Sequence, residues 1–355
     1  MMTLFDYETA PTAVGARRRR GPLARALPTV LALALVAAGV FGFLGFQRLV
    51  DEYTAWTFTP SAAVTTILDS ADLTSQGRLL FLASKPMVES ASTFASNCAS
   101  NREGSGILGC YVPRTRSIHL FNVTDKRLSG LTEVVAAHEM LHAAWDRMNT
   151  VERQQVTALL EAEAAKLSGD AAFQTRMAYY AKNEPGQRDN ELHSIIGTEV
   201  ASISPALEAH YATWLGNRQA IVALQAKTNA VFSDLAKRSN DLTGAMDALQ
   251  TTINTEYSAY TSGYVQLNAD IRRFNARTDF TSVREEDQAR HELEVRRAAL
   301  GARYADILAK TADYNADLTE LTAIRDQTAG LNEALNHAPT TGGIPTPTPA
   351  SGSGD

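Results

Sequence analysis

The hydropathy pattern begins with a long apolar run close to the N-terminus. Residues 26–46 carry no charged side chain, and four arginines, Arg17 to Arg20, precede them. A helix of this length is about 30 Å long, which matches the hydrocarbon core of a bilayer. We therefore predict a transmembrane helix at residues 26–46. Because basic residues favour the cytoplasmic side, residues 1–25 are expected in the cytoplasm and the rest of the chain outside it.

A cleaved signal peptide is the alternative interpretation of this run. The residues that follow it, Gln47-Arg48-Leu49-Val50, lack the small side chains of a cleavage site. The apolar run is also longer than the core of a usual signal peptide. Both features favour a retained anchor and a single-pass protein of the cell membrane.

Residues 51–205 show the mixed pattern of a folded domain. Apolar positions recur at helical spacing over most of this region, whereas two short segments are rich in β-branched and aromatic residues. The pattern predicts a mainly α domain with a small sheet. The predicted helices cover residues 61–95, 132–148, 152–167, 171–182 and 190–203, and the predicted strands cover 107–112 and 117–123.

From residue 206 onward, apolar residues recur every seven positions, as they do in a coiled coil. One such row contains Met246, Ile253, Tyr260, Leu267 and Phe274, and another contains Leu293, Leu300, Ile307, Tyr314 and Leu321. A break near residues 275–280 separates the rows, so we predict an antiparallel coiled-coil hairpin over residues 206–336. The alternative is a helical bundle packed against the first domain. The hairpin is expected to present, exclude or recruit substrate, or to mediate self-association or binding of a protein partner.

Composition narrows the classes of function. The net charge of the 355-residue chain is −6, which gives no electrostatic reason to expect nucleic-acid binding. The only cysteines, Cys98 and Cys110, flank a stretch rich in Gly, Ser and Asn. Outside the cytoplasm such a pair predicts a disulfide. The last residues, 337–355, are dominated by Pro, Thr, Gly and Ser and are predicted to be a disordered tail.

The chemistry of the chain is concentrated in the sequence His138-Glu139-Met140-Leu141-His142. On a helix, His138 and His142 project from one face and can bind the same metal ion. Zinc lowers the pKa of a water molecule to near neutrality, and Glu139 can take the proton when that water attacks a carbonyl. The motif therefore predicts a site for one Zn²⁺ ion with Glu139 as the catalytic base.

The surroundings of the motif strengthen this interpretation. The flanking segments, residues 134–137 and 143–145, are apolar and predict a buried helix. Three titratable groups inside such a helix are costly unless something compensates them. A bound metal ion explains the presence of all three groups, whereas hydrogen bonds within an apolar core explain it less readily.

The motif resembles that of the zincin metallopeptidases. In that superfamily a strand beside the active-site helix pairs with the backbone of a bound peptide, which makes the strand at Ile118 to Val123 a candidate edge strand. The metzincin extension is absent, because Ala143-Ala144-Trp145-Asp146 lacks the glycine and third histidine of that pattern. The resemblance implies a gluzincin-like site in which a glutamate on a later helix completes the ligand set.

Two glutamates are candidates for the third ligand. Glu199 lies in Thr198-Glu199-Val200-Ala201-Ser202, which resembles the third-ligand segment of thimet-type and oligoendopeptidase F-type enzymes, and the preceding Gly197 permits a close helix approach. Glu191 lies eight residues earlier and can face the same side. We favour Glu199 as the ligand, with Glu191 as a partner that orients a histidine, and keep Glu191 as the alternative ligand.

The remaining candidates are less specific. Stabilisation of an oxyanion needs a hydrogen-bond donor, and the spacing does not choose among Tyr179, Tyr180, His193 and Tyr211. Asp146 is a candidate for orienting a metal-binding histidine. The histidines with no partner at ligand spacing are His119, His210, His291 and His337.

These patterns together predict a membrane-anchored zinc metallopeptidase that hydrolyses a peptide or protein substrate outside the cytoplasm. Two alternatives remain at this point. One is a surface-anchored coiled-coil interaction protein built on a degenerate zincin scaffold. The other is a zinc amidase that acts on cell-wall material.

Overall fold

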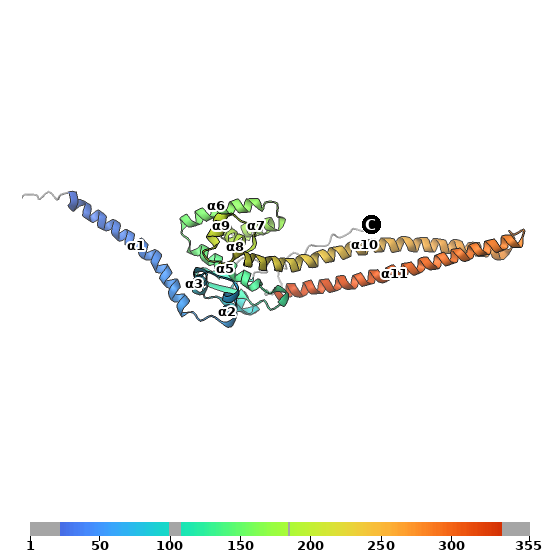
Figure 1. Ribbon diagram of the computed structural model, residues 1–355, viewed down its shortest axis with the longest axis horizontal. Coiled ribbons are helices and arrows are strands. Elements are labelled where there is room, and N and C mark those ends of the chain that lie inside the picture. Colours follow the sequence, from blue (N-terminus) through green and yellow to red (C-terminus); the bar gives the residue numbers. More distant parts are fainter. Residues whose placement is uncertain (1–21, 99–107, 184, 336–355) are drawn as a thin grey trace, which may run out of the picture.

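The structure is a computed structural model that describes residues 22–98, 108–183 and 185–335. It is mainly helical with one small sheet, as predicted (Figure 1). The elements in chain order are α1 (Pro22–Thr57), α2 (Ala62–Ser70), α3 (Ser75–Ala83), β1 (Met87–Glu89), α4 (Ala91–Asn97), β2 (Gly109–Val112), β3 (Ser117–Phe121), the short 3₁₀ helix η1 (Lys126–Leu128), α5 (Leu131–Arg147), α6 (Thr150–Lys166), α7 (Ala171–Asn183), α8 (Arg188–Glu199), α9 (Pro205–Tyr211), α10 (Arg218–Ala276) and α11 (Val283–Leu335). The helical region predicted over residues 61–95 consists of three helices, α2, α3 and α4, with the short strand β1 between α3 and α4.

The N-terminal run is helical and forms part of α1. Among the described residues, however, no helix has a stretch both long enough and apolar enough to span a bilayer. The structure therefore gives no support to the transmembrane helix predicted at residues 26–46. The predicted cytoplasmic segment lies outside the described residues as far as residue 21, and the predicted tail at 337–355 lies outside them entirely.

The end of α1 is fixed to the domain by a buried ion pair. Arg147, the last residue of α5, donates from Nε and Nη2 to the two carboxylate oxygens of Asp51, at 2.8 and 3.0 Å. The α1 helix also packs along α3. The chain that follows the apolar run is thus held directly against the end of the helix that carries the His-Glu-x-x-His motif.

The sheet has the strand order β1-β3-β2. β1 is parallel to β3, with Val88 opposite Leu120, and β2 is antiparallel to β3, with Cys110 opposite His119. The strand predicted at 117–123 is therefore central, and its assignment as an edge strand was wrong. β1 and β2 form the two edges of the described sheet.

A histidine network joins two of these strands. His119 is within 3.0 Å of both Glu89 Oε1 on β1 and Ser117 Oγ on its own strand. Asn97 at the end of α4 donates to the same Glu89 oxygen at 2.8 Å. His119 therefore has hydrogen-bonding partners that tie β1 to β3, and the structure gives it a place in the packing of the sheet.

The helix α5 packs against both strands β2 and β3 of the sheet and against α8. Its residues Met140 and Leu141 are fully buried, as are Ile195 and Ile196 of α8. The two helices approach closely at Gly197, where a Cβ atom would lie 2.5 Å from Leu141 Cδ1. The close approach expected at this glycine is thus present. The same core also takes in Trp214, Leu215 and Ile221, so it extends beyond the predicted limit at residue 205.

The predicted disulfide between Cys98 and Cys110 is formed. It joins the end of α4 to β2, and both cysteines are buried beside Phe94 and Phe121. Closing a loop of this length stabilises a fold by about 3 kcal/mol in the chain-entropy description. The bond therefore fixes β2 at a point close to the candidate site.

The C-terminal part of the described chain forms a long hairpin in which α10 and α11 run side by side away from the domain (Figure 1). The heptad positions Met246, Leu267, Ile307 and Leu321 are buried in it. Ion pairs connect the two helices along their length, namely Arg238–Glu320, Arg303–Glu256 and Arg296–Asp270. The seven-residue pattern thus corresponds to a helix–helix seam rather than to a bundle folded over the domain.

Candidate metal centre

The helix α5 presents His138 and His142 on one face, one turn apart. Their ring centroids are 4.8 Å apart, and the ring planes are nearly perpendicular. The helix begins at Leu131, after Gly130 with a φ of +98°, one residue before the start predicted at residue 132. The spacing of the motif has therefore placed the two imidazoles where the sequence predicted.

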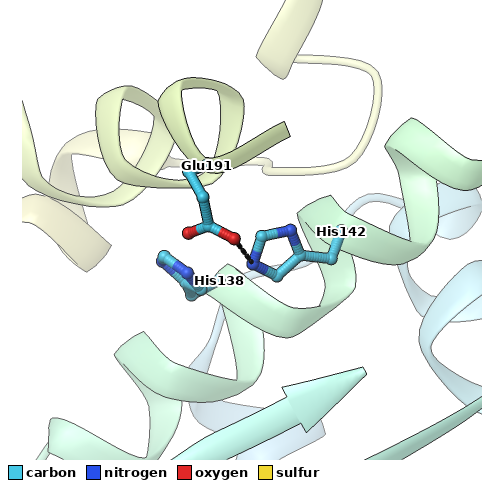
Figure 2. Close-up of side chains that lie close together, drawn as sticks. All are labelled: His138, His142 and Glu191. Carbon is cyan, nitrogen blue, oxygen red and sulfur yellow. Dashed lines mark ion pairs between the residues drawn. The ribbon is translucent and has the colours of Figure 1, made fainter. Parts of the chain in front are cut away.

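The helix α8 supplies the third group, Glu191. Figure 2 shows its carboxylate above the two imidazoles. One ligand atom from each of His138, His142 and Glu191 lies within 4.8 Å of the other two. The Nε2 atom of His142 is 3.7 Å from Glu191 Oε1, and both side chains are almost completely buried. Ligands about 2 Å from a tetrahedral zinc ion are about 3.3 Å apart, so small side-chain movements bring this set to bonding geometry.

The hydrogen bonds of Nδ1 fix the tautomer of His142. Nδ1 lies 2.9 Å from Asn190 Oδ1 and 3.1 Å from Ser194 Oγ, both on α8. The amide oxygen of Asn190 can only accept, so Nδ1 carries the proton and Nε2 presents its lone pair toward Glu191. This Nε2 is buried without a hydrogen-bond partner among the described residues. A lone pair buried opposite a carboxylate fits a cation between them.

The pKa of His138 is held well below its usual value. Burial is the largest cause, followed by the charges of His142, Arg176 and His193 when those groups are protonated. Metal binding needs a neutral imidazole, so a proton does not compete with a metal at neutral pH. The site thus offers two imidazole nitrogens and one carboxylate oxygen, a group that could hold a metal ion.

Glu139 is buried and adjoins β2. At Gly109, the first residue of that strand, a Cβ atom would lie 2.7 Å from Glu139 Oε1 and 2.5 Å from Val135 Cγ1. Any side chain at this position would collide with α5. Gly109 therefore lets an edge strand pass directly over the predicted catalytic base.

The structure does not bring Glu199 to the histidines. Both of its carboxylate oxygens accept hydrogen bonds from Nη1 of Arg176 on α7, each at 2.7 Å. The preference for Glu199 over Glu191 as third ligand is thereby corrected. The cause is an arginine 23 residues earlier in the chain, which gives Glu199 a partner that short-range spacing does not reveal.

The predicted oxyanion donors are dispersed. Tyr211 is buried and donates to the carbonyl oxygen of His193, and burial raises the pKa of its hydroxyl. His193 is fully buried, with its Nε2 2.8 Å from His210 Nε2. Tyr180 is half-buried at the edge of the core, and Tyr179 is more exposed and contacts Tyr180. None of them is singled out as the donor.

The fully buried His193 and the half-buried His210 form a pair that the sequence did not suggest. Burial lowers the pKa of both, that of His210 to about 4. Asp146, considered as a partner of a metal-binding histidine, instead accepts a hydrogen bond of 2.9 Å from Tyr111 on β2. The residues that do hold His142 are Asn190 and Ser194. Their spacing of four is the one signal that could have indicated a shared helix face.

Comparisons with protein-family models, with curated proteins and with solved structures find no match for this chain. The resemblance to zincins therefore rests on the sequence motif. The case for a metal rests on the grouping of His138, His142 and Glu191.

Proposed function

We propose that this chain is a zinc-dependent metallopeptidase. The observation that carries the proposal is the convergence of His138, His142 and Glu191, within 4.8 Å of one another, beside a buried Glu139. Two nitrogens and one carboxylate oxygen form a ligand set of catalytic rather than structural zinc, since structural sites use mostly cysteine and close all four positions. The arrangement is gluzincin-like, with Glu191 in the role of the third ligand.

Each side chain has a separate task in this proposal. His138 and His142 donate lone pairs, and Asn190 with Ser194 keeps the His142 ring in the required orientation. Zinc, when bound, supplies a Lewis acid that activates water and polarises the substrate carbonyl. Glu139 accepts the proton of the attacking water and passes it to the leaving amine, which is the general acid–base part of the reaction.

The substrate backbone is proposed to pair with the outer edge of β2. This strand pairs only with β3 in the described sheet, so its other edge has no strand partner. Because Gly109, Cys110 and Tyr111 are buried, this edge has to become exposed before a peptide pairs with it. β2 begins at Gly109, in contact with Glu139. A peptide added along this edge would run past the catalytic base, a role that the central strand β3 is unable to perform.

The hydrolytic proposal is tested by removing and restoring the metal. The full-length chain purified in detergent is expected to contain one zinc ion by mass spectrometry. It is expected to cleave some members of a set of unstructured peptides. A strong chelator should abolish cleavage, and added Zn²⁺ should restore it. A chain that holds no metal, or that cleaves equally well after the metal is removed, would contradict the proposal.

We also propose, from the sequence, that residues 26–46 anchor the protein in the cell membrane with the metal centre outside the cytoplasm. The disulfide supports this location, because such bonds persist in oxidising compartments. The protein is expected to stay in the membrane fraction after an alkaline carbonate wash. In intact cells Cys98 and Cys110 should react with a maleimide only after reduction. Release into the soluble fraction, or free thiols without reduction, would argue for another location.

A further inference from the structure

Arg176 has an unusual position for a charged residue of the domain surface. It lies on the inner face of α7, which is marked by the buried side chains of Phe173 and Met177 and packs against α8. Its guanidinium is held by Glu199, at the end of the helix that carries Glu191. Arg176 is therefore fixed against the end of α8, the helix that supplies the third ligand of the metal centre.

The hydrogen bonds of this guanidinium are made by one nitrogen only. Nη1 donates to both oxygens of Glu199, whereas Nε and Nη2 donate to none of the described residues. The arginine side chain is 36% exposed. Nε and Nη2 of the planar guanidinium thus remain available to a ligand. Two such donors in one plane can bind both oxygens of a carboxylate.

We propose that Arg176 is a specificity-determining residue that binds a carboxylate of the substrate, with Glu199 as the residue that positions it. This inference rests on the proposed peptidase function and names the feature of the peptide that the site selects. Glu199 holds the guanidinium in place at the end of α8. The second partner of the guanidinium is then supplied by the substrate.

The geometry limits where this carboxylate lies on the peptide. Glu191 and Glu199 are eight residues apart, which is about 12 Å along a helix. An extended peptide advances about 3.4 Å per residue. The carboxylate bound by Arg176 is thus within about three or four residues of the bond that is cleaved. It is either the C-terminal carboxylate or the side chain of an acidic residue.

Three peptides of one parent sequence separate these sources. The first has a free C-terminus, the second a C-terminal amide, and the third a C-terminal amide with glutamate as its last residue. The zinc-loaded wild-type chain should cleave the first or third with kcat/KM at least about tenfold above the second, as expected for a charge-assisted hydrogen bond. Preference for the first alone identifies the main-chain carboxylate, and equal preference for the first and third identifies any nearby carboxylate.

The decisive variant is R176Q, with R238Q as the matched control. Arg238 is also paired with a glutamate, but on the hairpin. R176Q should abolish the preference, so that its kcat/KM for the acid peptide falls to the value that the same variant shows for the amide, while R238Q should keep the preference. A wild type that treats all three peptides alike overturns the inference. So does an R176Q variant that loses the same factor on all of them.

Binding distinguishes failure of this inference from failure of the proposed function. In zinc-loaded E139Q protein, calorimetry should show that the preferred acid binds at least about tenfold more tightly than the amide. The difference should vanish in E139Q/R176Q. Carboxylate-dependent binding by a wild-type chain that cleaves no peptide would overturn the peptidase and support the carboxylate site. Equal binding of acid and amide would overturn the carboxylate site itself.

Discussion

Substitution of Glu139 by glutamine is expected to lower kcat/KM for peptide cleavage by about 10²- to 10⁴-fold, the range of a lost general base. The amide has nearly the shape of the carboxylate but does not accept a proton. Since Glu139 is not one of the three grouped ligands, the variant should retain one zinc ion per chain. Mass spectrometry of the purified protein and steady-state cleavage of a peptide measure the two quantities.

A glutamate on the same helix supplies the control for this experiment. Glu133 lies in the first turn of α5 and accepts a hydrogen bond from Ser70, away from the ligand group. Its change to glutamine should leave kcat/KM within about twofold, since substitutions away from specific features have small effects. A zinc-loaded E139Q protein that cleaves as fast as the wild type would show that Glu139 is not the catalytic base.

The sequence predicted those parts of the site that depend on a single helix. His138, Glu139 and His142 lie within five consecutive residues, so the geometry of α5 fixes their relation. The third ligand depends on how α8 packs on α5 and on which charges compete for its glutamates. Glu191 was recognised as a candidate, but the choice between it and Glu199 was decided by Arg176, which lies on a different helix.

The sheet shows a similar limit. β3 was found because it contains the β-branched, apolar and aromatic residues Ile118, Leu120 and Phe121, whereas β1 has only three residues, Met87–Glu89. A strand this short is defined by its parallel pairing with β3, a contact between segments about 30 residues apart. Because β1 was not predicted, the strand at residues 117–123 was assigned to the edge of the sheet. The hairpin, in contrast, repeats its pattern over many heptads, and its seam was predicted from local spacing.

The assignment of Glu191 as a zinc ligand predicts the second large effect, a loss of zinc affinity. Replacement of Glu191 by glutamine is expected to weaken zinc binding by more than about 100-fold. Mutation of a residue that only hydrogen-bonds to a metal ligand lowers metal affinity by about 10- to 100-fold. Loss of a direct anionic ligand is expected to lower it more. Zinc affinity is measured by competition with a chromophoric chelator at fixed pH. The far-ultraviolet circular dichroism spectrum should remain unchanged, which shows that the helices are intact.

Glu199 is the matched control, because the same substitution on the same helix removes the same charge. Its carboxylate is already bound by Arg176, so the glutamine variant should bind zinc within a few-fold of the wild type. A larger loss of affinity in E199Q than in E191Q would return the third ligand to Glu199 and require α8 to turn relative to α5. Equal losses would mean that α8 responds as a unit to its charges, and the grouping of Glu191 with His138 and His142 would no longer identify a ligand.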